Sequence, residues 1–294
     1  MKGPALQAPP AGLSANLGRL DRELCDRFSQ YSETAALDSK VLLAFILKQP
    51  KSWVVAHPEY TLEPHEMASL SEAVTRLDRA TPLPYVLGAW EFYGHTFKIS
   101  PAVLIPRPET ELLVERAVRW LERRPDRRRA ADIGTGCGCI AVSLAKSIPD
   151  LQVIATDISF ASLEIAQENI HRHHASGRIK LVQSDLLNSL EERLDLICAN
   201  LPYIPSETLR SLPVAAHEPW TALDGGPDGM AVINRLMESL SASILPGGLV
   251  LLEIEARQGQ IALDSARSFF PGAAVGLSQD LAGLDRLISI HIPD

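Results

Sequence analysis

The chain has 294 residues, of which 46% are hydrophobic and 22% are charged, a balance typical of a globular protein with a sizeable core. No run approaches the ~18 uninterrupted apolar residues of a membrane span, and the N-terminus lacks the apolar stretch of a secretory signal. A net charge of −8 argues against a protein that coats long DNA or RNA, because such proteins gain affinity from many phosphate contacts. We therefore expect a cytoplasmic protein without membrane binding or stable nucleic-acid binding.

The cysteines and histidines do not form a metal-binding pattern. The four cysteines are irregularly spaced and include no CxxC pair, which excludes a zinc ribbon and a disulfide framework. Three histidines fall within residues 171–174, at the end of a helix-like segment where the helix dipole favours them. We expect free thiols in a reducing compartment and no metal.

The first part of the chain has helical periodicity. Apolar residues at steps of three and four from Leu13 to Phe28 predict an amphipathic helix. A second helix is expected to follow Asp38 as its N-cap, and a third to begin at Pro64. These features predict a small helical domain over residues 1–81.

Residues 82–108 have a different character, because prolines punctuate them. Within this segment, residues 91–99 have strand propensity and are interrupted by Gly94, which predicts a β-hairpin. We interpret residues 82–108 as a hairpin linker between two domains.

From residue 109 to residue 294, predicted strands and helices alternate, which indicates a parallel sheet covered on both faces. The expected helices are 109–123, 139–147 and 159–173, and the expected strands are 130–133, 152–156, 179–182, 194–199 and 249–255. Alternation in residues 284–292, after a strand near 274–277, predicts a terminal antiparallel pair.

The first strand of this region runs into the glycine-rich sequence DIGTGCGC, residues 132–139. Glycines between a strand and a helix let the backbone approach a ligand closely. Asp157 lies 23 residues after Gly134, where an acidic side chain can accept hydrogen bonds from ribose hydroxyls. A dinucleotide-binding GxGxxG pattern would need glycine where Cys139 stands, so the spacing favours S-adenosylmethionine.

The third strand ends at Asp185 and Leu186. In an open sheet this edge lies beside the carboxyl end of the second strand, where ligands bind. Asp185 is a candidate acceptor for an adenine amino group, with Leu186 beside it, and the alternative is a helix N-cap.

The fourth strand ends in the tetrapeptide Asn200-Leu201-Pro202-Tyr203. An amide or aromatic amine is a poor nucleophile because its lone pair is delocalised, and two acceptors aimed at its N–H groups would localise that pair. The Asn200 side-chain carbonyl supplies one acceptor, and a backbone carbonyl of Leu201 or Pro202 in a proline-fixed turn can supply the other. Tyr203 can stack on the planar group. Catalysis would then be mainly positioning and electrostatics.

With these motifs, the chain resembles the bacterial release factor glutamine N5-methyltransferase family over nearly its whole length. The sequence IPRPETE, within residues 104–111, narrows a broad methyltransferase fold to this family. The matching stretches are 84–88, 91–94, 104–111, 132–140, 157–159, 184–186, 200–205, 218–219 and 225–229.

The resemblance implies an α/β fold: a seven-stranded, Rossmann-like class I methyltransferase domain over 109–294, a hairpin linker and an N-terminal helical domain that recognises the substrate. It implies methylation of the glutamine in the Gly-Gly-Gln motif of class 1 peptide-chain release factors, with S-adenosylmethionine as cofactor and S-adenosylhomocysteine as product. The implied catalytic residues are Asn200, Pro202 and Tyr203, and the same tetrapeptide with Leu201 binds the substrate. The implied cofactor residues are Gly134, Thr135, Gly136, Cys137, Gly138, Asp157, Asp185, Leu186 and Asn200.

Two positions depart from the family pattern. Leu201 stands where the family usually has proline, and Glu255 stands where it commonly has glycine. The tetrapeptide NLPY is also similar to that of ribosomal-RNA adenine dimethyltransferases, so an adenine N6-methyltransferase acting on RNA or DNA is the alternative hypothesis. Six arginines between Arg119 and Arg129 are the feature that keeps this alternative open. A non-catalytic binding module with the same fold is a third hypothesis, and nothing in the sequence requires more than a monomer.

Overall fold

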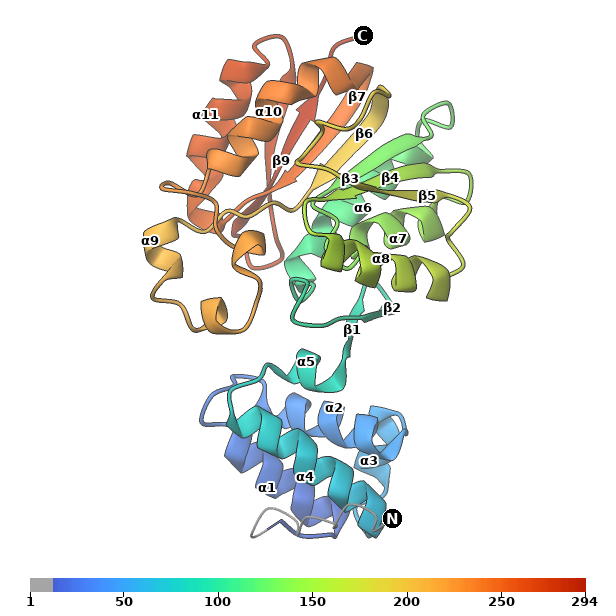
Figure 1. Ribbon diagram of the computed structural model, residues 1–294, viewed down its shortest axis with the longest axis vertical. Coiled ribbons are helices and arrows are strands. Elements are labelled where there is room, and N and C mark those ends of the chain that lie inside the picture. The colour runs from blue at the N-terminus through green and yellow to red at the C-terminus, as the bar shows by residue number, and fades with distance from the viewer. Residues whose placement is uncertain (1–12) are drawn as a thin grey trace. The chain divides into compact units, whose positions relative to one another are not determined.

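The structure is a computed structural model that describes residues 13–294 (Figure 1). The chain divides into two compact units, with the division between Gly88 and Ala89. None of the helices in residues 13–294 is long and apolar enough to cross a membrane. The first twelve residues of the predicted N-terminal domain lie outside the described residues.

The first unit is a set of helices around one apolar core. Its helices are α1 (Leu17–Phe28), α2 (Ala35–Leu47), α3 (Lys51–Ala56), α4 (Pro64–Asp78) and α5 (Leu83–Leu87). The predicted helix from Leu13 begins at Leu17, because Asn16 caps it by accepting a hydrogen bond from the backbone N–H of Arg19. The buried residues of α1 and α2 are mostly leucines, and they form the core with α4.

Two predictions for this unit are wrong in detail. Asp38 does not cap α2 but lies inside its first turn, where it accepts a hydrogen bond of 2.5 Å from the Ser32 hydroxyl ahead of the helix. The segment expected to begin a linker at residue 82 instead contains α5. The Arg76 guanidinium donates to the carbonyls of Tyr85 (2.9 Å) and Val86 (3.2 Å), which ties α5 to α4 and moves the division to Gly88.

The predicted hairpin is present and belongs to the second unit. Strands β1 (Ala89–Phe92) and β2 (His95–Lys98) pair antiparallel around Tyr93 and Gly94, which both have positive φ as a two-residue hairpin turn requires. The backbone N–H of Lys98 donates to the Asn169 side chain at 2.7 Å. The backbone N–H of Tyr93 donates to Glu111, also at 2.7 Å. These bonds fix the hairpin to the larger unit.

The second unit is built on a seven-stranded sheet in the order β5-β4-β3-β6-β7-β9-β8. Strand β9 runs antiparallel to both neighbours and the remaining pairs are parallel, so the predicted fold class and terminal antiparallel pair are confirmed. The strands are β3 (Arg129–Ile133), β4 (Gln152–Asp157), β5 (Ile179–Gln183), β6 (Leu194–Ala199), β7 (Ile244–Glu253), β8 (Ala274–Gln279) and β9 (Asp285–His291).

Helices cover both faces of this sheet (Figure 1). On one face lie α6 (Glu111–Glu122), α7 (Cys139–Ser147) and α8 (Phe160–Arg172), and on the other lie α10 (Ala231–Ser243) and α11 (Gly259–Phe269). All six residues of β6 are buried, as expected for a central parallel strand. A short helix, α9 (Ser206–Leu209), lies in the long connection after β6.

Gly138 marks the closest approach between α7 and α8. Its φ is +82°, and a Cβ placed there would lie 3.3 Å from the Cβ of Ala166. We expect Gly138→Ala to lower the free energy of unfolding by about 2–3 kcal/mol, because left-handed strain and overpacking add. Gly94→Ala is the matched control, since Gly94 has φ +70° with nothing within 4 Å of its Cβ position, and it should lose only about 1–2 kcal/mol. Equal losses in urea unfolding would show that contact with α8 is not what requires glycine.

Candidate active site

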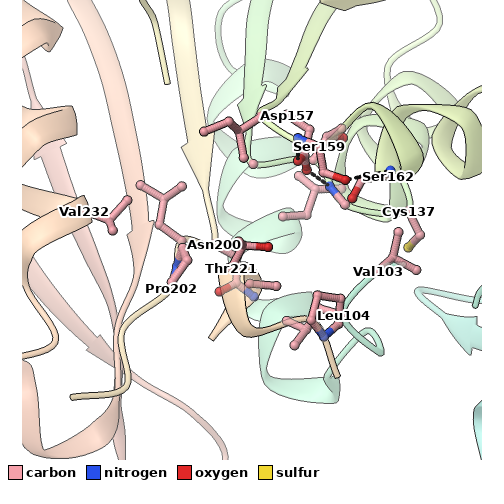
Figure 2. A pocket seen from close by; sticks show the side chains of 18 of the residues that line it. Val103, Leu104, Cys137, Asp157, Ser159, Ser162, Asn200, Pro202, Thr221 and Val232 are labelled. Carbon is pink, nitrogen blue, oxygen red and sulfur yellow. Dashed lines mark hydrogen bonds between the residues drawn. The ribbon is translucent and has the colours of Figure 1, made fainter. Parts of the chain in front are cut away.

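A pocket of about 340 Å³ opens at the carboxyl ends of the central parallel strands, where open α/β sheets bind ligands (Figure 2). Ten residues predicted for the site line it: Gly134, Thr135, Gly136, Cys137, Asp157, Asp185, Leu186, Asn200, Leu201 and Pro202. The two other predicted residues, Gly138 and Tyr203, are not among its lining residues. Gly138 serves helix packing, and Tyr203 lies behind the tetrapeptide.

The glycine-rich loop is held against the adjacent strand by its backbone. The N–H groups of Gly134 and Thr135 both donate to the Thr156 carbonyl, at 2.9 and 2.8 Å. Gly136 has φ +56° and nothing within 4 Å of its Cβ position, so its backbone faces open space in the pocket. A Cβ at Gly134, by contrast, would lie 3.0 Å from the side chain of Leu201. The loop therefore brings bare backbone to a ligand, as a cradle for a small donor molecule requires.

Asp157 anchors this loop from the end of β4. One carboxylate oxygen accepts from the Gly136 N–H and the other from the Ser159 N–H, both at 2.9 Å. Burial raises the pKa of Asp157, and these backbone donors oppose the rise. Each oxygen keeps a further lone-pair direction, which fits the predicted contact with ribose hydroxyls. Figure 2 shows Asp157, Ser159 and Asn200 around the same pocket.

Asp185 has a partner that the sequence analysis missed. Its carboxylate forms a 2.5 Å ion pair with Arg235 of α10, and both residues line the pocket. Leu186 has φ +54°, and its carbonyl accepts from the Thr156 hydroxyl at 3.3 Å. The adenine contact of Asp185 stays a prediction, and any such contact would share the carboxylate with Arg235.

Asn200 lies just beyond β6, and its side-chain amide has a defined partner. The Nδ2 group donates to the Thr110 hydroxyl at 3.0 Å. Thr110 is 2% exposed and ends the short 3₁₀ helix Pro108–Thr110, within the IPRPETE sequence. Sequence analysis quoted this segment for its resemblance and assigned Thr110 no role in the site.

Tyr203 is held from two sides. Its hydroxyl donates to Glu253 at the end of β7, at 3.4 Å, and its carbonyl accepts from Gln258 at 2.8 Å. Glu253 is 3% exposed, and burial raises its pKa to about 7 although a hydrogen bond from the Thr110 hydroxyl opposes the rise. Burial also raises the pKa of Tyr203, so its hydroxyl keeps its proton.

The two departures from the family pattern have simple structural outcomes. Leu201 is 4% exposed and belongs to the core beneath the sheet ends, packing close to Gly134. Glu255 caps the 3₁₀ turn Ala256–Gln258, accepting from the Arg257 N–H at 3.0 Å. Because Gln258 in that turn holds the Tyr203 carbonyl, Glu255 supports the tetrapeptide from a distance.

A buried ion pair ties together two segments at the pocket rim. Glu218 forms a salt bridge with Arg107, and its other carboxylate oxygen accepts from the Ile105 N–H at 3.0 Å. Pro106 and Arg107 on one side, and Pro219 to Ala222 on the other, line the pocket. Glu218 therefore fixes the spacing of these two rim segments.

Within residues 13–294, no group of three or more histidine, cysteine, aspartate or glutamate side chains is arranged to hold a metal. His173 instead bonds the Thr96 carbonyl at 3.0 Å. Part of the arginine-rich stretch is neutralised locally: Arg127 pairs with Asp195 at 3.2 Å and Arg128 with Asp150 at 2.6 Å.

Asp132, at the end of β3, gives a pH-dependent prediction for stability. Burial raises its pKa from 3.8 to about 7, so between these values the folded state holds a proton that the unfolded chain has lost. Stability should therefore fall as pH rises through this window, with a slope of about 1.4 kcal/mol per pH unit from this group. We expect Asp132→Asn to remove that slope, because Asn can still accept from the Thr135 hydroxyl and the Ala141 N–H.

The measurement is urea unfolding of wild type and Asp132→Asn at pH 5, 6 and 7, with the exposed Asp126→Asn as control. The stability of Asp132→Asn relative to wild type should increase with each step. A difference that stays constant across the three pH values would contradict a proton held by Asp132.

The seven-stranded fold, the glycine-rich loop and the acidic residue at the end of β4 define a class I methyltransferase. Residues 109–214 match the methyltransferase small domain, and residues 21–88 match the PrmC N-terminal domain. The chain is 40% identical over 256 residues to release factor glutamine methyltransferase of Moorella thermoacetica, covering 86% of this chain and 90% of the relative. It is 34% identical to that of Bradyrhizobium diazoefficiens, covering 97% of each. The chain belongs to the release factor glutamine methyltransferase family.

Solved structures share the fold at low sequence identity. The hMettl16 catalytic domain in complex with an RNA hairpin aligns with a TM-score of 0.54 at 17% identity, covering 78% of this chain and 82% of that one. A methyltransferase from Pyrococcus furiosus aligns with a TM-score of 0.52 at 18% identity, covering 76% of this chain and 100% of that one. These likenesses concern the fold alone.

Proposed function

We propose that this protein transfers a methyl group from S-adenosylmethionine to the side-chain amide nitrogen (N5) of the glutamine in the Gly-Gly-Gln motif of class 1 peptide-chain release factors. The observation that carries the proposal is the placement of Asn200. Its amide lies on the same pocket as the glycine-rich loop and Asp157, with its Nδ2 group already bound to Thr110. Its carbonyl oxygen is therefore left for an acceptor N–H group.

The loop residues would hold the donor. Asp157 would bind ribose hydroxyls, the backbone at Gly136 would take the donor's close approach, and Asp185 with Leu186 would border the adenine. S-adenosylmethionine, when bound, supplies an electrophilic methyl group on a sulfonium. The apolar walls at Val103 and Leu104 exclude water from the same pocket.

The tetrapeptide would hold the acceptor. The Asn200 carbonyl and a backbone carbonyl of Leu201 or Pro202 accept the two N–H groups of the glutamine amide, which turns its nitrogen lone pair toward the methyl group. Tyr203 supports the planar amide. No strong base is needed for the attack, because the methylated amide loses its proton readily. The rate gain then comes from orientation and fixed dipoles.

The helical unit would bind the body of the release factor. Residues 21–88 match the N-terminal domain of relatives whose name includes release factors, and this unit contributes no residue to the pocket. A separate recognition unit suits a substrate whose methylated loop is a small part of a large protein.

The test is incubation of the purified protein with labelled S-adenosylmethionine and a class 1 release factor, with the modified residue located by mass spectrometry. We expect one methyl group on the glutamine of Gly-Gly-Gln and none on a factor in which that glutamine is replaced by glutamate. Methyl transfer to adenine in RNA or DNA, with none to the release factor, would overturn the proposal in favour of the adenine N6-methyltransferase.

A further inference from the structure

One buried carboxyl group lies behind both ends of the substrate tetrapeptide. Glu253 meets the Tyr203 hydroxyl at 3.4 Å and also receives a hydrogen bond from Thr110, whose own oxygen accepts from Asn200 at 3.0 Å. Resting on the proposed function, we propose that Glu253 and Thr110 are positioning residues that fix which way the Asn200 amide faces and hold Tyr203 in place during methyl transfer.

The direction of the hydrogen bonds carries the argument. A threonine hydroxyl has one proton, and an ionised carboxylate can only accept. When Glu253 is ionised, Thr110 must donate to Glu253 and can serve Asn200 only as an acceptor. The NH₂ side of the Asn200 amide then faces Thr110, and its carbonyl side faces the pocket. This is the orientation that an acceptor N–H group requires.

Protonation of Glu253 would remove this constraint. The carboxyl group would become a donor, and Thr110 could then accept from Glu253 and donate to the Asn200 carbonyl. In that arrangement the Asn200 amide is reversed and presents N–H groups to a substrate that itself offers N–H groups. The ionised state of Glu253 is therefore the productive one.

The surroundings of Glu253 make its protonation sensitive to pH. Glu253 and Thr110 are 3% and 2% exposed, so water does not compete for their hydrogen bonds. The groups that act on the Glu253 charge are Glu109, which raises its pKa, and Arg286, Thr110 and Tyr203, which lower it. One carboxylate oxygen, Oε2, has no hydrogen-bond partner in residues 13–294. Burial dominates, so a modest change of pH near neutrality changes the population of the ionised form.

A simple packing role does not account for this arrangement. A buried carboxyl with an unpartnered oxygen is costly, and an apolar side chain at the end of β7 would avoid that cost. The compensating gain that the contacts suggest is orientation, because the two residues that Glu253 reaches, directly or through Thr110, are both members of the tetrapeptide.

The test measures the pH dependence of kcat for methyl transfer to a class 1 release factor, between pH 5.5 and 9, with the full-length protein. Wild type should lose about tenfold in kcat per pH unit below an inflection near 7 and be flat above it. Glu253→Gln should lower kcat at pH 8 by about 10–100-fold and abolish the inflection, because the uncharged amide offers Thr110 both donor and acceptor groups. Its Kd for S-adenosylmethionine should stay within about threefold of wild type, which shows that the fold is retained.

Thr110 provides an independent arm. Thr110→Val, of similar shape but without the hydroxyl, should resemble Glu253→Gln, and Thr110→Ser should restore most of the wild-type kcat. Glu238→Gln, at an exposed position of α10, is the control and should behave as wild type.

Glu253→Gln with wild-type kcat and an unchanged inflection would overturn the inference, as would equal kcat values for Thr110→Val and Thr110→Ser. Failure of the proposed function has a different signature, since wild type itself would then transfer no methyl group to the release factor at any pH.

Discussion

Replacing Asn200 with alanine is expected to lower kcat for release factor methylation by about 10²–10³-fold, the usual cost of losing one fixed polar group that acts on the reacting atoms. The side chain supplies one of two acceptors for the glutamine N–H groups, and water admitted in its place would not be oriented. Because Asn200 is expected to act mainly on the acceptor, the Kd of S-adenosylmethionine should change by no more than about threefold.

The comparison requires kcat at saturating release factor together with the donor Kd from calorimetry. Asn188→Ala is the matched control, because Asn188 is exposed and does not line the pocket. Unchanged turnover in Asn200→Ala would remove Asn200 from the catalytic assignment. A donor Kd that rises in parallel with the loss of kcat would instead make it a donor-binding residue.

Long periodic segments of this fold are predictable from sequence because local pattern and tertiary burial agree in them. Helix α7 and strand β6 begin and end where the apolar pattern predicts, at 139–147 and 194–199. The short helices α3 and α5 are not predictable in this way, since segments of six and five residues hold too little periodic signal. Helix α5 exists because Arg76 binds its carbonyls, which is a tertiary cause.

The site divides along the same line. Parallel-sheet topology brings the carboxyl ends of neighbouring strands together, so residues that follow those strands, such as Asp157 and Asn200, can be grouped from sequence alone. The supporting residues cannot be grouped in that way. Thr110 is 90 positions from Asn200, Glu253 is 50 from Tyr203, and neither pairing has a local signal. The IPRPETE sequence was the available clue to Thr110.

Replacing Asp157 with alanine should weaken donor binding by about 100-fold while lowering kcat at saturating donor much less. A hydrogen bond to a charged group is worth about 1.5–3 kcal/mol, so losing both predicted ribose contacts costs at least that factor. The loop also loses its anchor, because Asp157 holds the N–H of Gly136. We expect this second effect to appear as slower turnover when the donor is below saturation.

The two effects can be separated with Asp157→Asn. Asparagine keeps one acceptor for the Gly136 N–H but replaces the other carboxylate oxygen with a donor, which then faces the N–H of Ser159. It should therefore weaken donor binding almost as strongly as alanine, because the ribose contact and the loop anchor both depend on an acceptor at each oxygen. Asp264→Asn on α11, exposed and remote from the pocket, is the control for the lost charge. Donor binding by Asp157→Ala within threefold of wild type would mean that the carboxylate serves the loop alone, and the ribose would have to be held by other residues of the pocket.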